Sequence, residues 1–263
     1  MPGHPAVLWI GIPAAALLGF IYLLMPLIVR AAHWQSREPR ILPRDPARGE
    51  ADAFFDSIFP ALADAGFREA TRFLFVDFTP NVTTEICMMT DRARGVMAVG
   101  MVHFVTKPGQ ARPPTRSLEF TTSFEDGGSC NTIRSTVVMP WTEIGLKRMY
   151  EVASVADPLK LLAVHEAIVR ADGGGRRAKD PPLQAELPEK MRESIVRDLD
   201  EQIRWGWLRP DPGSPRCLLT LRGAYIMTWQ QLWPFSRLRR RARGRRERDL
   251  LGRIGFEQTP ARS

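Results

Sequence analysis

The sequence predicts an α+β fold, because strand-like and helix-like patterns occupy separate stretches of the chain. Closely spaced runs of β-branched and aromatic residues, broken by turn residues, fill residues 72–137. Apolar residues recur at helical spacing in residues 51–67 and again in residues 157–236. We therefore expect a helix and an antiparallel meander of four or five strands packed with C-terminal helices, preceded by an N-terminal transmembrane helix.

The transmembrane helix is predicted from an uncharged run of 24 residues, Ala6 to Val29. At about 1.5 Å per residue, a helix of this length measures about 36 Å, enough to cross the hydrocarbon core with some tilt. Trp9 and Tyr22 lie toward its two ends, where interfacial aromatic residues are common. A cleavable signal sequence, cut near Val29-Arg30-Ala31, is the weaker alternative because no Lys or Arg precedes the run.

The flanking charges indicate how such a helix is oriented. Five arginines lie in residues 30–48, whereas only the α-amino group and His4 precede the run. The positive-inside rule then predicts a single-pass protein of a bacterial inner membrane, with the N-terminus outside and the C-terminal part in the cytoplasm. Three cysteines without a CxxC pair fit a reducing compartment and predict neither a disulfide framework nor a zinc site.

The first folded elements follow a proline-rich linker. Phe55, Ile58, Phe59 and Leu62 have helical spacing, and Pro60 is expected to kink or split their helix. Strands are expected at residues 72–78, 82–90, 95–107, 116–125 and 129–137. The fourth of these strands alternates apolar and polar residues, whereas the third is apolar on both faces, so the sheet should be covered by a second layer.

Two helices and a basic segment complete the chain. Asp157-Pro158 is an N-cap followed by proline at the first helical position, and a glycine triplet at 173–175 ends that helix. The expected organisation is a transmembrane helix with its flanks (1–34), a linker (35–50), an α+β domain (51–171), a flexible linker (172–187), a helix-hairpin-helix segment (188–236) and an Arg-rich tail (237–263).

The net charge of +8 is concentrated rather than spread. Residues 237–253 hold nine arginines against Glu247 and Asp249, so this segment alone carries 9 − 2 = +7. Aromatic residues precede it directly, and this combination is typical of contact with anionic lipid headgroups, where each arginine contributes about 1 kcal/mol. The residues expected to contact the lipid bilayer are Trp9, Tyr22, Arg30, Trp34, Trp229, Trp233, Phe235, Arg237, Arg239, Arg240, Arg241, Arg243, Arg245 and Arg246.

Two other interpretations of this segment remain open. Trp229 and Trp233 could belong to the core, with the arginines forming a solvated tail. The arginines could also release counterions from nucleic-acid phosphates, although no aromatic residues are interleaved with them for base stacking.

Enzyme signals are poor, and we assign no catalytic, cofactor-binding or metal-ligating residue. His165 lies on the apolar stripe of its helix and His103 on a strand with two apolar faces, so core positions are expected for both. Cys87 and Cys130 are expected to be buried thiols. Glu119, Glu125 and Asp126 could gather at one end of the sheet, but alternation also explains Glu119 as a solvent-facing residue. The glycine triplet lacks the GK[ST] ending of a phosphate loop.

Two resemblances add to this interpretation. The segments LEFTTSFEDG (118–127), DPLKLLAVHEAIVRA (157–171) and LTLRGAYIMTWQQLWP (219–234) resemble a family of uncharacterised bacterial proteins with one N-terminal transmembrane helix and an α+β cytoplasmic part. That resemblance implies no activity and no site residues. Separately, the helix, turn and strand order over residues 188–223 is similar to the last helix and wing of winged-helix DNA-binding domains.

The sequence thus predicts a membrane-anchored protein whose cytoplasmic α+β domain binds or scaffolds an unknown protein partner, with an Arg-rich segment on anionic lipid. The alternatives are a membrane-tethered nucleic-acid-binding protein of winged-helix type and a membrane-bound enzyme of unrecognised type.

Overall fold

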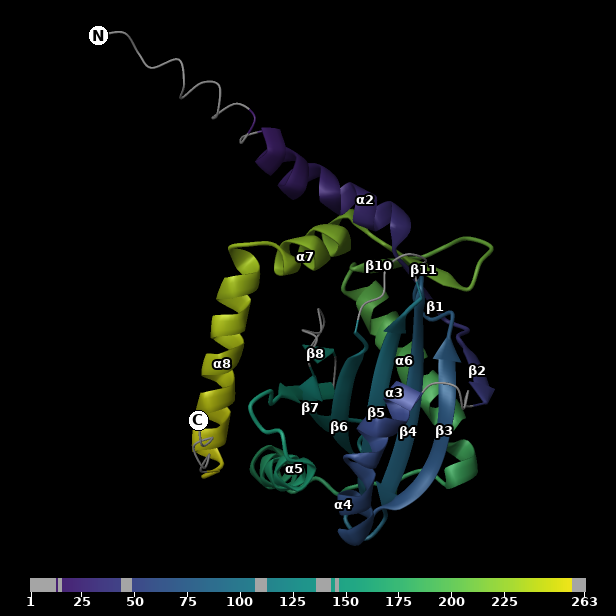
Figure 1. Ribbon diagram of the computed structural model, residues 1–263, viewed down its shortest axis with the longest axis vertical. Helices are drawn as coiled ribbons and strands as arrows, with labels where there is room; N and C mark the ends of the chain where they lie inside the picture. The colour runs from purple at the N-terminus through teal and green to yellow at the C-terminus, as the bar shows by residue number, and fades with distance from the viewer. Residues whose placement is uncertain are drawn as a thin grey trace, which may run out of the picture.

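Two β-sheets organise the chain, one of eight strands and one of three (Figure 1). The computed structural model describes residue 13 and residues 16–43, 49–106, 113–135, 143–144 and 147–256. Helices pack on the sheets, and the fold is α+β, as the sequence predicts.

The large sheet has the strand order β2-β3-β4-β5-β6-β7-β9-β8. Its strands are β2 (Arg40–Pro43), β3 (Arg68–Val76), β4 (Val82–Asp91), β5 (Val96–Val105), β6 (Thr115–Ser123), β7 (Ser129–Ser135), β8 (Glu143–Ile144) and β9 (Lys147–Glu151). Strands β3 to β7 form the expected antiparallel meander. Strand β9 pairs with β7 in parallel, so the sheet is mixed rather than wholly antiparallel.

Three helices cover one face of the large sheet: α3 (Gly49–Asp56), α4 (Phe59–Asp64) and α5 (Pro158–Asp172). Pro60 lies in the first turn of α4, which separates α3 from α4. Phe55 and Phe59 pack on β5 at Gly100, where a Cβ atom would lie 3.1 Å from ring carbons of both. Helix α5 begins at Asp157, whose carboxylate accepts a hydrogen bond of 2.8 Å from the Lys160 amide.

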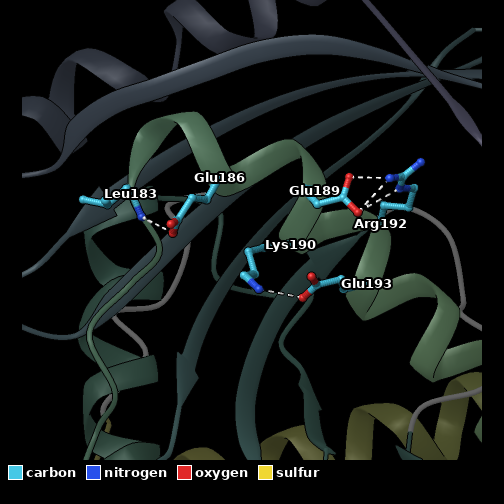
Figure 2. Close-up of polar contacts among 6 residues, drawn as sticks. All are labelled: Leu183, Glu186, Glu189, Lys190, Arg192 and Glu193. Atoms are coloured by element: carbon cyan, nitrogen blue, oxygen red, sulfur yellow. Dashed lines mark hydrogen bonds and ion pairs between the residues drawn. The ribbon is translucent and has the colours of Figure 1, made fainter.

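The opposite face is covered by η2 (Gln184–Glu186) and α6 (Leu187–Arg204). Leu187 is fully buried against Phe73, Phe75 and neighbouring strand residues. On the outer side of α6, Glu189 pairs with Arg192 and Lys190 with Glu193, three residues apart in each case (Figure 2). Helix α6 is therefore amphipathic: its apolar side packs on the sheet, and the charged residues on its outer side form ion pairs with one another.

The small sheet has the order β1-β11-β10 and joins residues far apart in sequence. Its strands are β1 (Trp34–Ser36), β10 (Leu208–Pro210) and β11 (Arg216–Leu219). It packs with α7 (Leu221–Gln231) and with α2 (Met25–Ala32), which η1 (Phe20–Leu24) directly precedes. Gly223 allows a close approach here, because a Cβ atom would lie 2.1 Å from the Trp207 carbonyl oxygen.

The arginine-rich segment is a helix, α8 (Phe235–Arg253), where the sequence led us to expect a tail. It runs from α7 along the flank of the large sheet toward α5 (Figure 1). Its C-terminal half is attached to the domain, because Leu250 and Leu251 are buried in the core that also contains α5. Glu247 accepts hydrogen bonds from the Ser154 amide (2.7 Å) and hydroxyl (2.6 Å).

The expected transmembrane helix is not found in the described part of the chain, where no helix is both long enough and apolar enough to cross a membrane. Nine of residues 6–29, including Trp9, lie outside the described residues. Residues 16–19 are helical, and residues 20–29 are divided between η1 and α2. Three predictions from the sequence are therefore wrong: a fold that includes a transmembrane helix, a chain that spans a membrane, and a single-pass protein of the inner membrane. An uncharged run is ambiguous because it also suits a helix that packs on protein, as α2 packs on α7.

Both expected linkers contain ordered contacts. The stretch 35–50 holds β2 and most of β1, and residues 44–48 lie outside the described part. In 172–187, Ala178 forms an isolated bridge with Phe124, and the Arg176 guanidinium lies 4.1 Å from the Phe124 ring centre. These contacts join residues too distant in sequence to be inferred from local composition.

Candidate functional site

At one end of the molecule α2 lies beside α7, which leads into α8 (Figure 1). Large apolar side chains of these elements, and of the helical residues just before α2, are exposed there. We call this surface the apolar end. Its members are Leu17, Leu18, Phe20, Leu23, Leu24, Leu27, Ile28, Trp229, Trp233, Phe235 and Leu238. Exposed apolar groups gathered in this way mark an interaction site more often than scattered ones do.

A proline explains the local shape of this surface. In an α-helix the Tyr22 carbonyl would accept from the amide of residue 26, but that residue is Pro26, which has no N–H group. The chain forms the π-helical turn η1 at this point, with the Met25 amide bonded to the Phe20 carbonyl. The Trp229 indole N–H donates to the Tyr22 carbonyl at 3.0 Å, so a side chain of α7 supplies the missing donor.

Aromatic rings connect the two sides of the apolar end. The Tyr225 hydroxyl donates to the Leu23 carbonyl at 3.0 Å. The ring of Phe235 stacks on Trp229 with centroids 5.9 Å apart and meets Tyr22 edge-on at 6.4 Å. Residues about 200 positions apart thus form one aromatic cluster, in which Trp229 is 38% exposed and Phe235 43% exposed.

Exposed arginines lie on the helices that adjoin this cluster. Arg30 lies in the last turn of α2, and Arg237, Arg240, Arg241 and Arg245 lie on the outer side of α8. The sequence prediction had placed all of these residues at a lipid surface. The structure brings their helices next to the exposed Trp233 and Phe235.

Other residues from the predicted set lie elsewhere. The Trp34 ring is half-buried on β1 and is covered by the Arg216 guanidinium, 4.5 Å from its centroid. Arg243 pairs with Glu151 at 3.0 Å, with side-chain exposures of 14% and 11%. Arg239 donates to Gln230. The helical period turns Arg239 and Arg243 inward, since they are four residues apart on one face of α8.

The histidines and cysteines have structural environments. His165 is fully buried, and its two ring nitrogens lie 2.9 Å from the hydroxyls of Thr122 and Thr132. Burial lowers the pKa of His165 to about 3. Burial also lowers the pKa of His103, which contacts the Thr84 hydroxyl, and raises the pKa of Cys130 to about 12. These environments do not suit a general base or a reactive thiol.

The acidic residues considered in the sequence are also engaged. Asp126 pairs with Arg176, whose hydrogen bonds lower the Asp126 pKa, and Glu125 pairs with Arg177. Glu119 accepts from the Thr121 hydroxyl and from Asn131. Among the described residues, no group of histidine, cysteine or carboxylate side chains is arranged to hold a metal ion.

Sequence reasoning missed a cavity between α8 and β9. It is lined by Arg148 and Tyr150 of β9, by the inner side of α8, by Gln230 and by Asp172 at the end of α5. The spacing of Arg239, Arg243 and Arg246 was the available signal, because positions i, i+4 and i+7 share one side of a helix.

Comparison with known proteins gives no match to a family model, to a curated protein or to a solved structure. The two resemblances noted from the sequence therefore stay predictions. The inference of function rests on the geometry described above.

Proposed function

We propose that the protein is a binding protein that docks its apolar end onto an anionic lipid surface. The observation that carries this proposal is the exposed aromatic cluster of Tyr22, Trp229 and Phe235, adjoined by helix α8 with its outward arginines. The contact is peripheral: aromatic side chains enter the headgroup layer while guanidinium groups meet lipid phosphates.

The magnitudes favour such a contact. Trp233 is 69% exposed, which leaves its ring free to enter the headgroup region. Each arginine near an anionic surface contributes about 1 kcal/mol, so Arg237, Arg240 and Arg241, in the first two turns of α8, together supply about 3 kcal/mol before losses from counterions and geometry. An apolar anchor and a basic cluster act together, and two such signals are what stable peripheral attachment requires.

The charge on α6 favours lipid over nucleic acid. In the winged-helix comparison α6 would be the helix that meets DNA, yet it carries five carboxylates against four basic residues, or 4 − 5 = −1. Arg192, Lys190 and Arg204 are paired with carboxylates of the same helix (Figure 2 shows the first two pairs). Paired cations give little counterion release on phosphates.

Vesicle co-sedimentation of the full chain tests the proposal. We expect binding to vesicles that contain an anionic phospholipid, weak binding to neutral vesicles, and a decrease as salt is raised. The triple variant Arg237→Gln/Arg240→Gln/Arg241→Gln should bind anionic vesicles at least about tenfold more weakly. The matched control Arg92→Gln/Arg170→Gln/Arg177→Gln removes the same charge from exposed positions on other surfaces and should stay within about twofold.

Three results would contradict lipid docking. Equal losses in the two triple variants would indicate a general charge effect, and equal binding to neutral vesicles would remove the role of the arginines. A chain that ignores anionic vesicles but shifts duplex DNA with steep salt dependence would be a nucleic-acid-binding protein instead.

A further inference from the structure

A half-open cavity of about 930 Å³ lies between α8 and β9, on the side of α8 that faces away from the outward arginines. Helix α8 provides one wall, β9 provides another, and Gln230 of α7 and Asp172 of α5 lie at its margins. This volume is within the range of pockets that hold small organic ligands, about 300–1,000 Å³.

The lining is rich in positive charge. Among the described lining residues, six are cations and four are carboxylates, a surplus of 6 − 4 = +2. The cations come from two elements that are separate in sequence: Lys147 and Arg148 from β9, and Arg239, Arg243, Arg246 and Arg253 from α8.

Three of the carboxylates already hold α8 against the domain. Glu151 pairs with Arg243. Asp172 accepts from the Tyr150 hydroxyl at 2.6 Å and from Arg253 at 2.7 Å. Glu247 accepts from Ser154 as described above. These carboxylates therefore serve the attachment of the helix and have little capacity left to neutralise other cations.

Two cations that line the cavity have no carboxylate paired with them among the described residues. Neither Arg148 nor Arg246 forms an ion pair with another described residue, and Lys147 is paired with Asp198 of α6 at 2.7 Å. Burial lowers the pKa of Arg239, and the nearby positive charges of Arg243 and Arg246 lower it further, against the opposing effect of Glu151. Positive charge is thus crowded at this position, where an anion would relieve the repulsion.

We propose that this cavity binds a phosphoryl group, carried by a soluble phosphomonoester or by a lipid headgroup, between the exposed Arg148 of β9 and two arginines that line the cavity from α8, the half-buried Arg239 and the exposed Arg246. A phosphomonoester carries a charge of about −1.5 to −2 near pH 7, opposite in sign to the lining, whose surplus is +2 before the pairing of Lys147 with Asp198 and +1 after it. Guanidinium groups from two elements can donate paired N–H bonds from two directions. The three oxygens of a phosphoryl group can accept more of these bonds than the two oxygens of a carboxylate can. The cavity also leaves room beyond the phosphate for an organic group, next to Met149 and Ala242.

This binding goes beyond lipid docking, because it uses the inner side of α8 and lipid docking uses the outer side. The test is calorimetric titration of the full chain with glycerol 3-phosphate, together with sedimentation on vesicles that contain phosphatidate. The cavity variant is Arg148→Gln/Arg246→Gln. The matched control, Arg92→Gln/Arg248→Gln, removes two exposed arginines that neither line the cavity nor belong to the outward set used in lipid docking.

We expect glycerol 3-phosphate to bind the wild-type chain, the cavity variant to bind it at least about tenfold more weakly, and the control to stay within about twofold. Arg246→Lys keeps the charge but loses the planar donor pair, so it should give a smaller loss. If glycerol 3-phosphate does not bind but phosphatidate vesicles do, with a loss only in the cavity variant, the phosphoryl group belongs to a lipid.

The inference is overturned if neither probe distinguishes the cavity variant from its control. Its failure is separable from failure of lipid docking. The triple variant at Arg237, Arg240 and Arg241 should keep its affinity for glycerol 3-phosphate, and the cavity variant should still bind vesicles of phosphatidylglycerol.

Discussion

The large sheet and the apolar end use the same kinds of side chain in opposite ways. Phe55 and Phe120 are fully buried in the sheet layers, whereas Trp233 is 69% exposed. The large sheet has helices on both faces, so its aromatic residues are enclosed. Helices α2 and α7 pack on each other and on the small sheet, and their remaining sides have no cover among the described residues.

The comparison shows that apolar composition predicts burial only where a second layer exists to provide it. An exposed apolar group is ordinary when it is isolated, but the apolar end gathers many of them beside a dense cation cluster. Polar groups show the same contrast. In the sheet core His165 is satisfied by two threonine hydroxyls, whereas at the apolar end side chains of α7 satisfy backbone carbonyls of η1.

The largest expected effect on stability tests the enclosed core of the large sheet. Phe55→Ala should lower the free energy of unfolding by about 3–5 kcal/mol, because it leaves a cavity where the ring packs on Phe59 and Gly100. Trp233→Ala should change it by about 0.5 kcal/mol or less, since most of that side chain is in solvent. Urea unfolding measures both, and similar values for the two variants would contradict the contrast between the regions.

An intermediate effect tests the polar part of the core. His165→Gln should cost about 1–3 kcal/mol at pH 7, because Thr122 and Thr132 lose partners. The folded-state pKa of about 3 lies below the unfolded value, so the unfolded state binds more protons as pH falls from about 6.5 toward 3. Stability from the neutral ring is therefore fully present above pH 6.5 and is lost on acidification, by about 1 kcal/mol at pH 5.5.

The measurement for this acid effect is urea unfolding at pH 7 and at pH 5.5. The wild-type chain should lose more stability between the two than His165→Gln does. His33 and His103, whose pKa values burial also lowers, remain in the variant, so part of the acid loss should persist. An identical loss in both proteins would show that His165 does not stay neutral in the fold.

The smallest expected effect sharpens the description of the apolar end. Trp229→Phe keeps the ring contact with Phe235 but removes the donor to the Tyr22 carbonyl, at a cost of about 1 kcal/mol. Hydrogen exchange should become faster for amides in α2 and stay unchanged in β4 and β5. Trp205→Phe is the control, because Trp205 is half-exposed and lies outside this cluster. Faster exchange in both variants would mean that this bond does not attach α2 to α7.

Much of the fold could be predicted from local patterns. The strands β3 to β7, the break at Pro60 and the cap at Asp157 all follow from residues within a few positions of one another. The core placement of His165 was predictable for the same reason, because it shares a helical stripe with Leu161 and Ile168. The expected transmembrane helix was wrong because hydropathy alone does not distinguish lipid from protein as the surroundings of an apolar run.

The candidate site was only half predictable. The aromatic residues before α8 and its arginines were visible in the sequence, but their division into an outer and an inner set was not. Arg239 and Arg243 share one side of α8, and that side faces the domain, where Gln230 and Glu151 are their partners and Ser154 is the partner of Glu247.

The sequence by itself determined the α+β class, the periods of its strands and helices, and the concentration of positive charge in residues 237–253, because these depend on neighbouring residues. Only the tertiary structure decided the pairing of β1 with β11, the parallel position of β9, the contact between η1 and α7, and the cavity beneath α8. Each of these joins segments distant along the chain. Their free energy comes from partners that no local window of sequence contains.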